Sequence, residues 1–157
     1  MRDLVLSQPQ EHTVSGETTV EIVTLQFNAA TTDRLVRAFE LRPSNRNLLH
    51  HAIIRAGNVD LAAWAMCDNG IQVPPGTAWR IPRNVPLSVE LHYFKRTLRP
   101  ARDLTRIALY YAKTKPTREA FLFTLNNTDL RIPAGANLHP EEFTHKIPES
   151  LRLHAVL

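Results

Sequence analysis

Apolar and polar residues alternate along several short stretches of this chain, most regularly over residues 87–93. The odd-numbered positions there are apolar or aromatic, and the even-numbered positions are Ser88, Glu90 and His92. Because successive side chains of a β-strand point to opposite faces, this pattern predicts a half-buried strand. We therefore expect His92 to lie on the polar face of that strand and not in the core.

Similar patterns predict further strands over residues 18–27, 48–55, 106–112, 120–125 and 151–157. Residues 33–41 fit a short helix capped by Thr32 or Asp33, whereas residues 36–42 also fit a strand that ends before Pro43. We expect a strand there, preceded by a helical turn. Eleven prolines and many short strands are typical of an all-β protein, so we predict an antiparallel β-sandwich or jelly roll.

Length and composition narrow the class of protein. The 157 residues are enough for a sizeable core. No apolar run approaches the roughly 20 residues that a membrane span needs, and residues 1–7 lack the apolar segment of a signal peptide. Cys67 is the only cysteine, so no internal disulfide can form. Its thiol is expected to be either a small buried hydrophobe or a soft copper ligand.

Positive charge is concentrated in one part of the chain, whose formal net charge is +4. Eight of the 19 Lys and Arg residues fall between Lys95 and Arg118, where Asp103 is the only acidic residue. Such a stretch can attract phosphate or an acidic partner. It lacks the interleaved aromatic residues and the motifs of nucleic-acid binders, so we expect a solvated basic face and no nucleic-acid partner.

Three of the seven histidines are candidates for a metal site, namely the adjacent pair His50-His51 and the distant His92. Three imidazoles can hold copper or zinc while leaving one position open. Adjacent residues of a regular strand face opposite ways. Both members of the pair can therefore reach one ion only if the backbone there is bulged, twisted or at a strand edge. Otherwise one histidine is buried and the other exposed. His139 and His145 are expected to be solvated loop residues.

Seven short motifs follow one another along nearly the whole chain. They are Asp3-Leu4-Val5-Leu6, Glu40-Leu41-Arg42-Pro43, Leu49-His50-His51-Ala52-Ile53-Ile54, Ala63-Trp64-Ala65, Val73-Pro74-Pro75-Gly76, Val89-Glu90-Leu91-His92-Tyr93 and Ile132-Pro133-Ala134-Gly135. Their order resembles bacterial members of the copper type II, ascorbate-dependent monooxygenases. That family includes peptidylglycine alpha-hydroxylating monooxygenase and dopamine beta-monooxygenase.

The resemblance implies a catalytic core of two β-sandwich domains, each of which binds one copper ion. Matched residue by residue, His50, His51 and His92 are the ligands of the first copper, the electron-transfer centre that is reduced by ascorbate. The implied function is the electron-transfer domain of an oxidoreductase that hydroxylates a C–H bond with O2. Glu90 and Ser88 share the polar face with His92 and are expected to orient a ligand imidazole.

The chain departs from the family at its end. The family's second domain holds the catalytic copper with a His-x-His motif and a methionine, whereas this chain reaches Leu157 without that motif and its methionines are Met1 and Met66. We expect residues 1–125 to be the N-terminal copper domain and residues 126–157 to be the opening strands of a truncated second domain.

This division has consequences for activity and partners. The chain would carry one copper, with a second expected in the full-length protein, and no catalytic residue, so alone it would not turn over. Its expected partners are the missing C-terminal catalytic domain, a small-molecule reductant and a second copy docked on the exposed truncated edge. A family-like protein would be periplasmic or secreted.

Two other readings stay open from the sequence. One is a β-sandwich binding or interaction module without a redox metal, which the basic stretch between Lys95 and Arg118 suggests. The other is a zinc ion at the same three histidines, with a bound water acting hydrolytically.

Overall fold

The computed structural model describes residues 2–66, 68, 70–142, 144–147 and 150–154. Within these residues all regular elements are β-strands, which confirms the all-β expectation. The strands are β1 (Leu4–Ser7), β2 (His12–Val14), β3 (Val20–Phe27), β4 (Arg34–Arg42), β5 (Leu49–Ala56), β6 (Val59–Ala65), β7 (Ile71–Gln72), β8 (Thr77–Ile81), β9 (Leu87–Phe94), β10 (Ala101–Asp103), β11 (Arg106–Tyr111) and β12 (Arg118–Ala120). The described part of the chain holds no helix that could serve as a membrane span.

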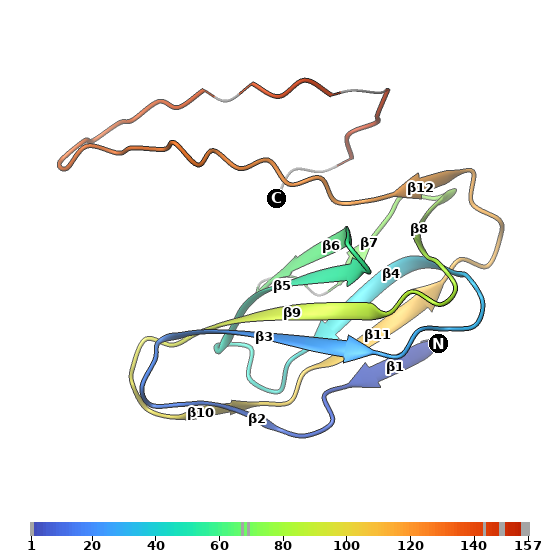
Figure 1. Ribbon diagram of the computed structural model, residues 1–157, viewed down its shortest axis with the longest axis horizontal. Coiled ribbons are helices and arrows are strands. Elements are labelled where there is room, and N and C mark those ends of the chain that lie inside the picture. The colour runs from blue at the N-terminus through green and yellow to red at the C-terminus, as the bar shows by residue number, and fades with distance from the viewer. Residues whose placement is uncertain (1, 67, 69, 143, 148–149, 155–157) are drawn as a thin grey trace. The chain divides into compact units, whose positions relative to one another are not determined.

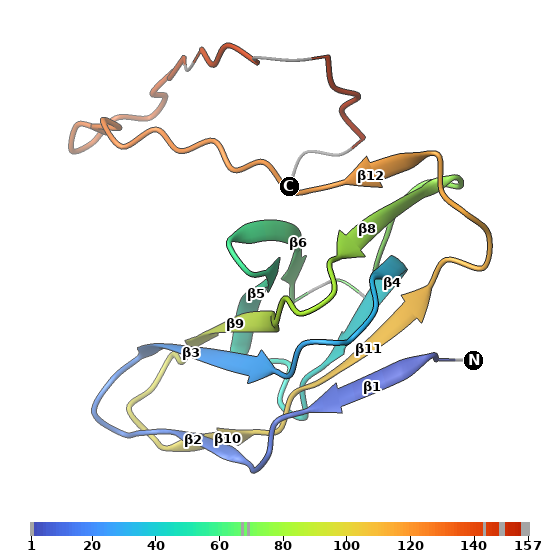
Figure 2. The same cartoon turned by 45° about the vertical axis from the view of Figure 1, so that its right-hand side comes forward.

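The strands form two main sheets that lie as layers, best separated in Figure 2. One sheet has the order β3-β9-β5-β6, and the other has the order β1-β11-β4-β8-β12, with β7 also paired to β4. Strands β10 and β2 pair as a separate ribbon, which Figure 1 shows at one end of the layers. Among the described strands the pairing is antiparallel except between β12 and β8. The antiparallel β-sandwich is therefore confirmed.

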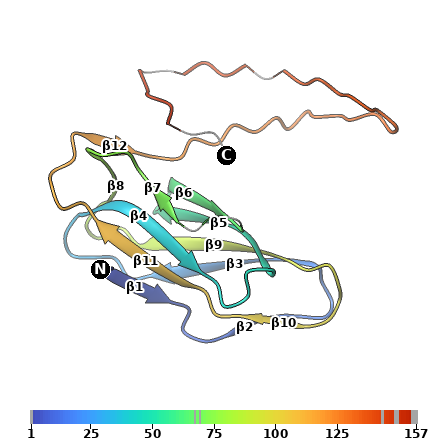
Figure 3. The same cartoon turned by 180° about the vertical axis from the view of Figure 1, so that it is seen from behind.

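One hydrophobic core joins the two layers. Leu91 and Ile54 of the β3-β9-β5-β6 sheet belong to the same buried cluster as Phe39 and Leu109 of the opposite sheet. Seen from behind in Figure 3, β4 and β11 cross in front of β9 and β3, which is the arrangement that closes this core. Burying these apolar side chains is the main force that holds the layers together.

Strand β9 lies in the middle of its sheet, with β3 on one side and β5 on the other. Its odd-numbered residues are at most 4% exposed, while Ser88, Glu90 and His92 are half-buried on the outer face. The alternation predicted for residues 87–93 is confirmed. His92 is thus fixed on the outside of the sandwich, at a central strand.

The helical turn expected before the strand over residues 36–42 was wrong, whereas the strand itself was right. Residues 31–33 form no helix, and β4 begins at Arg34. Asp33 does not cap a helix. Its carboxylate accepts hydrogen bonds from the backbone N–H of Arg83 (2.8 Å) and the guanidinium of Arg80 (2.7 Å). These bonds hold the pKa of Asp33 below its usual range. They also occupy the carboxylate that would otherwise have capped a helix.

The chain divides into two units, Met1–Leu122 and Phe123–Leu157. In the second unit none of the described residues lies in a strand. The strand expected at residues 120–125 was wrong, because β12 ends at Ala120. Residues 151–154 likewise have no regular structure, and residues 155–157 lie outside the described range. Apolar side chains in this unit stay exposed, as with Leu138 (86%) and Leu153 (79%), so burial stabilises no strand there. That residues 126–157 begin a second sandwich stays a prediction.

Candidate metal centre

Strand β5 carries one extra residue near its start. Leu49 pairs with Tyr93 and His51 pairs with His92, so His50 lies opposite no residue of β9. An unpaired extra residue is a β-bulge, and it shifts the alternation of the strand by one position. Leu49 and Ala52 are accordingly both buried, and the two histidines between them are not. The bulged backbone expected at His50-His51 is confirmed.

The bulge brings the histidine cluster, His50, His51 and His92, together on the outer face. The Nδ1 atoms of His50 and His51 lie 3.0 Å apart. The rings of His51 and His92 are stacked, with centroids 4.0 Å apart and planes inclined by 29°. Residues that are 41 positions apart in the sequence thus touch because β5 and β9 are neighbours in the sheet.

A chain of polar contacts links His92 through Glu90 and Arg55 to Asp60. His92 Nε2 lies 2.7 Å from Glu90 Oε1, and the other oxygen of Glu90 accepts a hydrogen bond of 2.8 Å from Arg55. Arg55 in turn donates to Asp60 at 2.6 Å. Because Glu90 holds Nε2, the nitrogen of His92 that stays free for a ligand role is Nδ1.

The electrostatics of the cluster favour the neutral form of His51. Partial burial lowers the pKa of His51, and the neighbouring His92 and His50 lower it further because each would repel a second positive charge. The pKa of Glu90 is lowered by its hydrogen bonds with His92 and Arg55. A metal ion binds the neutral form of imidazole. A neutral His51 beside a His92 that is held by a carboxylate therefore suits metal binding.

The chemistry of the donors fits a copper or zinc ion, but the rotamers are not those of a closed site. Two nitrogens on one ion, each about 2.0–2.1 Å from it, lie about 3 Å apart, which agrees with the His50–His51 separation. Among the described residues, however, no three His, Cys, Asp or Glu side chains have the geometry to hold a metal. The stacked rings of His51 and His92 face each other, so one of these side chains must rotate before three nitrogens converge.

The two residues expected to orient a ligand differ in their contacts. Glu90 makes the hydrogen bond to His92 that such a role requires. The side chain of Ser88 makes no hydrogen bond within the described residues, and its pairing partner on β5 is Arg55, away from the cluster. Cys67, considered above as a soft ligand, lies outside the described residues.

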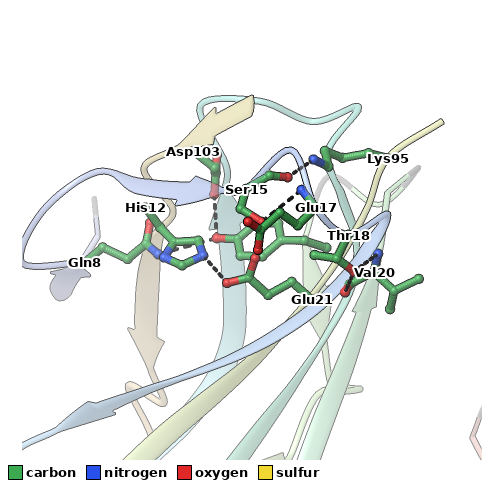
Figure 4. A network of polar contacts seen from close by, with 10 residues as sticks. Gln8, His12, Ser15, Glu17, Thr18, Val20, Glu21, Lys95 and Asp103 are labelled. Carbon is green, nitrogen blue, oxygen red and sulfur yellow. Dashed lines mark hydrogen bonds and ion pairs between the residues drawn. The ribbon is translucent and has the colours of Figure 1, made fainter. Parts of the chain in front are cut away.

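Other histidines have their own partners. Figure 4 shows the contact between His12 and Glu21. His12 Nε2 lies 2.8 Å from Glu21 Oε1, and the His12 ring stacks on Tyr93 with ring centroids 5.5 Å apart. His139 lies 2.8 Å from Glu141 in the second unit. Each of these pairs has the His–carboxylate contact of the cluster, but among the described residues neither has a neighbouring imidazole as His51 and His92 do.

Sequence reasoning missed Arg55, which connects Glu90 to Asp60. A signal was present, because Arg55 and Asp60 flank the short Gly57-Asn58 connection between β5 and β6. Gly57 has a φ of 58°, the left-handed conformation that a tight hairpin connection needs. An Arg and an Asp on either side of such a hairpin face each other across it.

Comparison of the chain with models of protein families, with curated proteins and with solved structures finds no match. No family is therefore assigned by comparison. Interpretation of the site depends on the motifs of the chain and on the geometry of the histidine cluster.

Proposed function

We propose that this chain is the electron-transfer copper domain of an O2- and ascorbate-dependent monooxygenase that hydroxylates a C–H bond. The observation that carries the proposal is the bulge at His50, which puts two adjacent imidazoles on one face, beside His92. A regular strand would have turned one of them into the core. The ordered motifs between Asp3 and Gly135 are the basis of the resemblance to this family.

Each residue of the cluster has a definite task in this proposal. His50 and His51 offer their Nδ1 atoms, and His92 offers Nδ1 while Glu90 holds the proton on Nε2. Arg55 keeps Glu90 ionised and in place. A copper ion bound there would supply one-electron redox chemistry, since imidazole tolerates both of its common oxidation states.

The proposal assigns no catalytic residue to this chain. Oxygen and the C–H substrate would bind at a second copper, which the resemblance places on another domain of the enzyme. The role of the present chain is to accept electrons from a reductant such as ascorbate and deliver them one at a time.

A copper titration followed by electron paramagnetic resonance tests the site. The protein should bind one Cu(II) with a nitrogen-rich signal, and the double variant His51→Ala, His92→Ala should lose it. His139→Ala is the matched control, because it removes a histidine that has a similar carboxylate contact but no neighbouring imidazole. An unchanged stoichiometry and spectrum in the double variant would show that the site is wrongly assigned.

One observation, the lack of a closed metal geometry among the described residues, favours a binding module without a redox metal. A binding module without a redox metal would give no specific copper signal, whereas a three-histidine zinc site would also take up added copper, because imidazole sites bind Cu(II) more tightly than Zn(II). Metal analysis of protein purified without added metal separates these readings. Copper supports the proposal, zinc supports the hydrolytic alternative, and a metal-free protein that still resists added copper supports the binding module.

A further inference from the structure

A groove next to the histidine cluster has a volume of about 870 Å³. We call it the His50 groove, because His50 forms part of its wall. Three segments build it: the chain entering β5, Met66 directly after β6, and residues 94–101, which run from the end of β9 to the start of β10. Its volume lies in the usual range for sites that bind small molecules.

The charge of the groove is entirely positive. The described residues that line it include Lys95, Arg96 and Arg99 but no Asp or Glu. Both arginines are exposed, and within the described part of the chain neither guanidinium makes a hydrogen bond or an ion pair. Unpaired guanidinium groups can form charge-assisted hydrogen bonds with a carboxylate or a similar planar anion.

Lys95 adds a third positive charge to the lining of the groove. It is only 6% exposed, and its amino group donates to the backbone carbonyls of Ser15 and Arg99, the first of which is drawn in Figure 4. Among the described residues no carboxylate forms an ion pair with it. A buried cation that is held only by carbonyl oxygens is stabilised by an anion bound nearby.

Phe94 and Met66 form an apolar part of the remaining wall, which also includes the polar residues Asn45, Asn47 and Thr97. Phe94 is 44% exposed, Met66 is 40% exposed, and the rings of Phe94 and His50 lie 6.2 Å apart. Exposed side chains of this kind favour a ligand that has a carbon skeleton as well as a charge. Inorganic anions would use only the arginines.

We infer that the His50 groove binds a small organic anion. Its carboxylate or enediolate lies against Arg96 and Arg99, and its carbon skeleton lies against Phe94 and Met66, beside His50. Ascorbate is an anion of this class at neutral pH. Its identification as the ligand rests on the proposed function, whereas binding of an organic anion does not.

The test uses the metal-free full chain and anaerobic ascorbate, with binding followed by calorimetry and by amide NMR shifts. The double variant Arg96→Gln, Arg99→Gln should weaken binding about tenfold or more, because two charge-assisted contacts are lost. The matched control is Arg106→Gln, Arg118→Gln, which removes the same charge from the same basic stretch but outside the groove. This control should bind as the wild type does, and far-ultraviolet circular dichroism should show all three proteins folded.

Two further probes test the chemistry of the ligand. L-gulono-1,4-lactone, a neutral relative of ascorbate, should not bind, and inorganic phosphate should bind more weakly than ascorbate. Equal loss of affinity in the two double variants would overturn the groove as the site. Phosphate binding as tightly as ascorbate would overturn the assignment to organic anions. Because no metal is present, a failure of copper to bind leaves these results unaffected, and the two proposals can fail separately.

Discussion

Neighbouring residues of strand β9, Tyr93 and His92, occupy opposite faces of the same sheet and have opposite kinds of polar surroundings. The Tyr93 hydroxyl is buried and bonded to Asp103 (3.1 Å), with Gln8 also in contact (3.4 Å). Burial and the charge of Asp103 both raise the pKa of the Tyr93 phenol. His92 is half-buried, has one carboxylate partner, and stacks on another imidazole.

The difference lies in how many polar atoms still lack a partner. Asp103 is completely buried and accepts bonds from Ser44, Asn45, Tyr93 and Thr105, so its oxygens are fully used. The cluster around His92 keeps ring nitrogens available for a ligand. A saturated buried network stabilises the fold, whereas an unsaturated, half-buried one can bind something.

Replacing Asp103 should have the largest effect of the changes proposed for these two sites, because it removes the centre of the buried network. In Asp103→Ala the hydroxyls of Tyr93 and Thr105 and the N–H of Asn45 lose their acceptor in the core. We expect the free energy of unfolding to fall by about 3 kcal/mol or more. Urea denaturation measures it, and Asp129→Ala, at an exposed position, should change it by less than about 0.5 kcal/mol. Similar values for the two variants would mean that the buried network has no structural role.

Replacing Glu90 should weaken copper binding while the protein stays folded. In Glu90→Gln the charge that holds His92 Nε2 is lost, so copper affinity should fall about 10- to 100-fold while the fold is kept. Competition titration with a chelator gives the affinity. The control is Glu21→Gln, which alters the comparable contact with His12. Wild-type affinity in Glu90→Gln would remove Glu90 from the site.

The smallest effect should be the pH dependence of stability that the lowered pKa of His51 causes. The folded pKa of His51 is below its ordinary value, so the folded state binds this proton less readily than the unfolded state does. The resulting stability is present above the ordinary histidine pKa of about 6.5 and is lost as the pH falls through the lower folded pKa. His50 and His92 add repulsion, and Glu90 opposes it.

Urea denaturation of the metal-free protein at several pH values measures this dependence. The variant His51→Gln should show a shallower loss of stability on acidification than the wild type, because it lacks the group whose pKa is lowered. Identical pH profiles for the two proteins would show that protonation of His51 is not coupled to folding.

Several features of the site could be predicted from local sequence. The alternation of residues 87–93 placed His92 and Glu90 on the outer face. Strand geometry let His50 and His51 reach one ion only if the backbone there was bulged, twisted or at a strand edge, and the structure has the bulge. Local patterns failed where a side chain acts over a long distance. Asp33 could have capped a helix, but it is bonded to Arg80 and Arg83, about 50 positions later. The apolar residues of 121–125 had strand character but gained no partner strand, since β12 ends at Ala120.

The sequence by itself determined that this protein is built of β-strands, and which face of β9 carries polar groups, because side-chain alternation is a local property of the backbone. Tertiary structure alone decided that His51 stacks on His92, that Arg55 holds Glu90, and that a positively charged groove lies beside His50. Those contacts depend on which strands pair and in which register. Pairing is set by how the two sheets bury their apolar faces together, and no short segment of the chain contains that information.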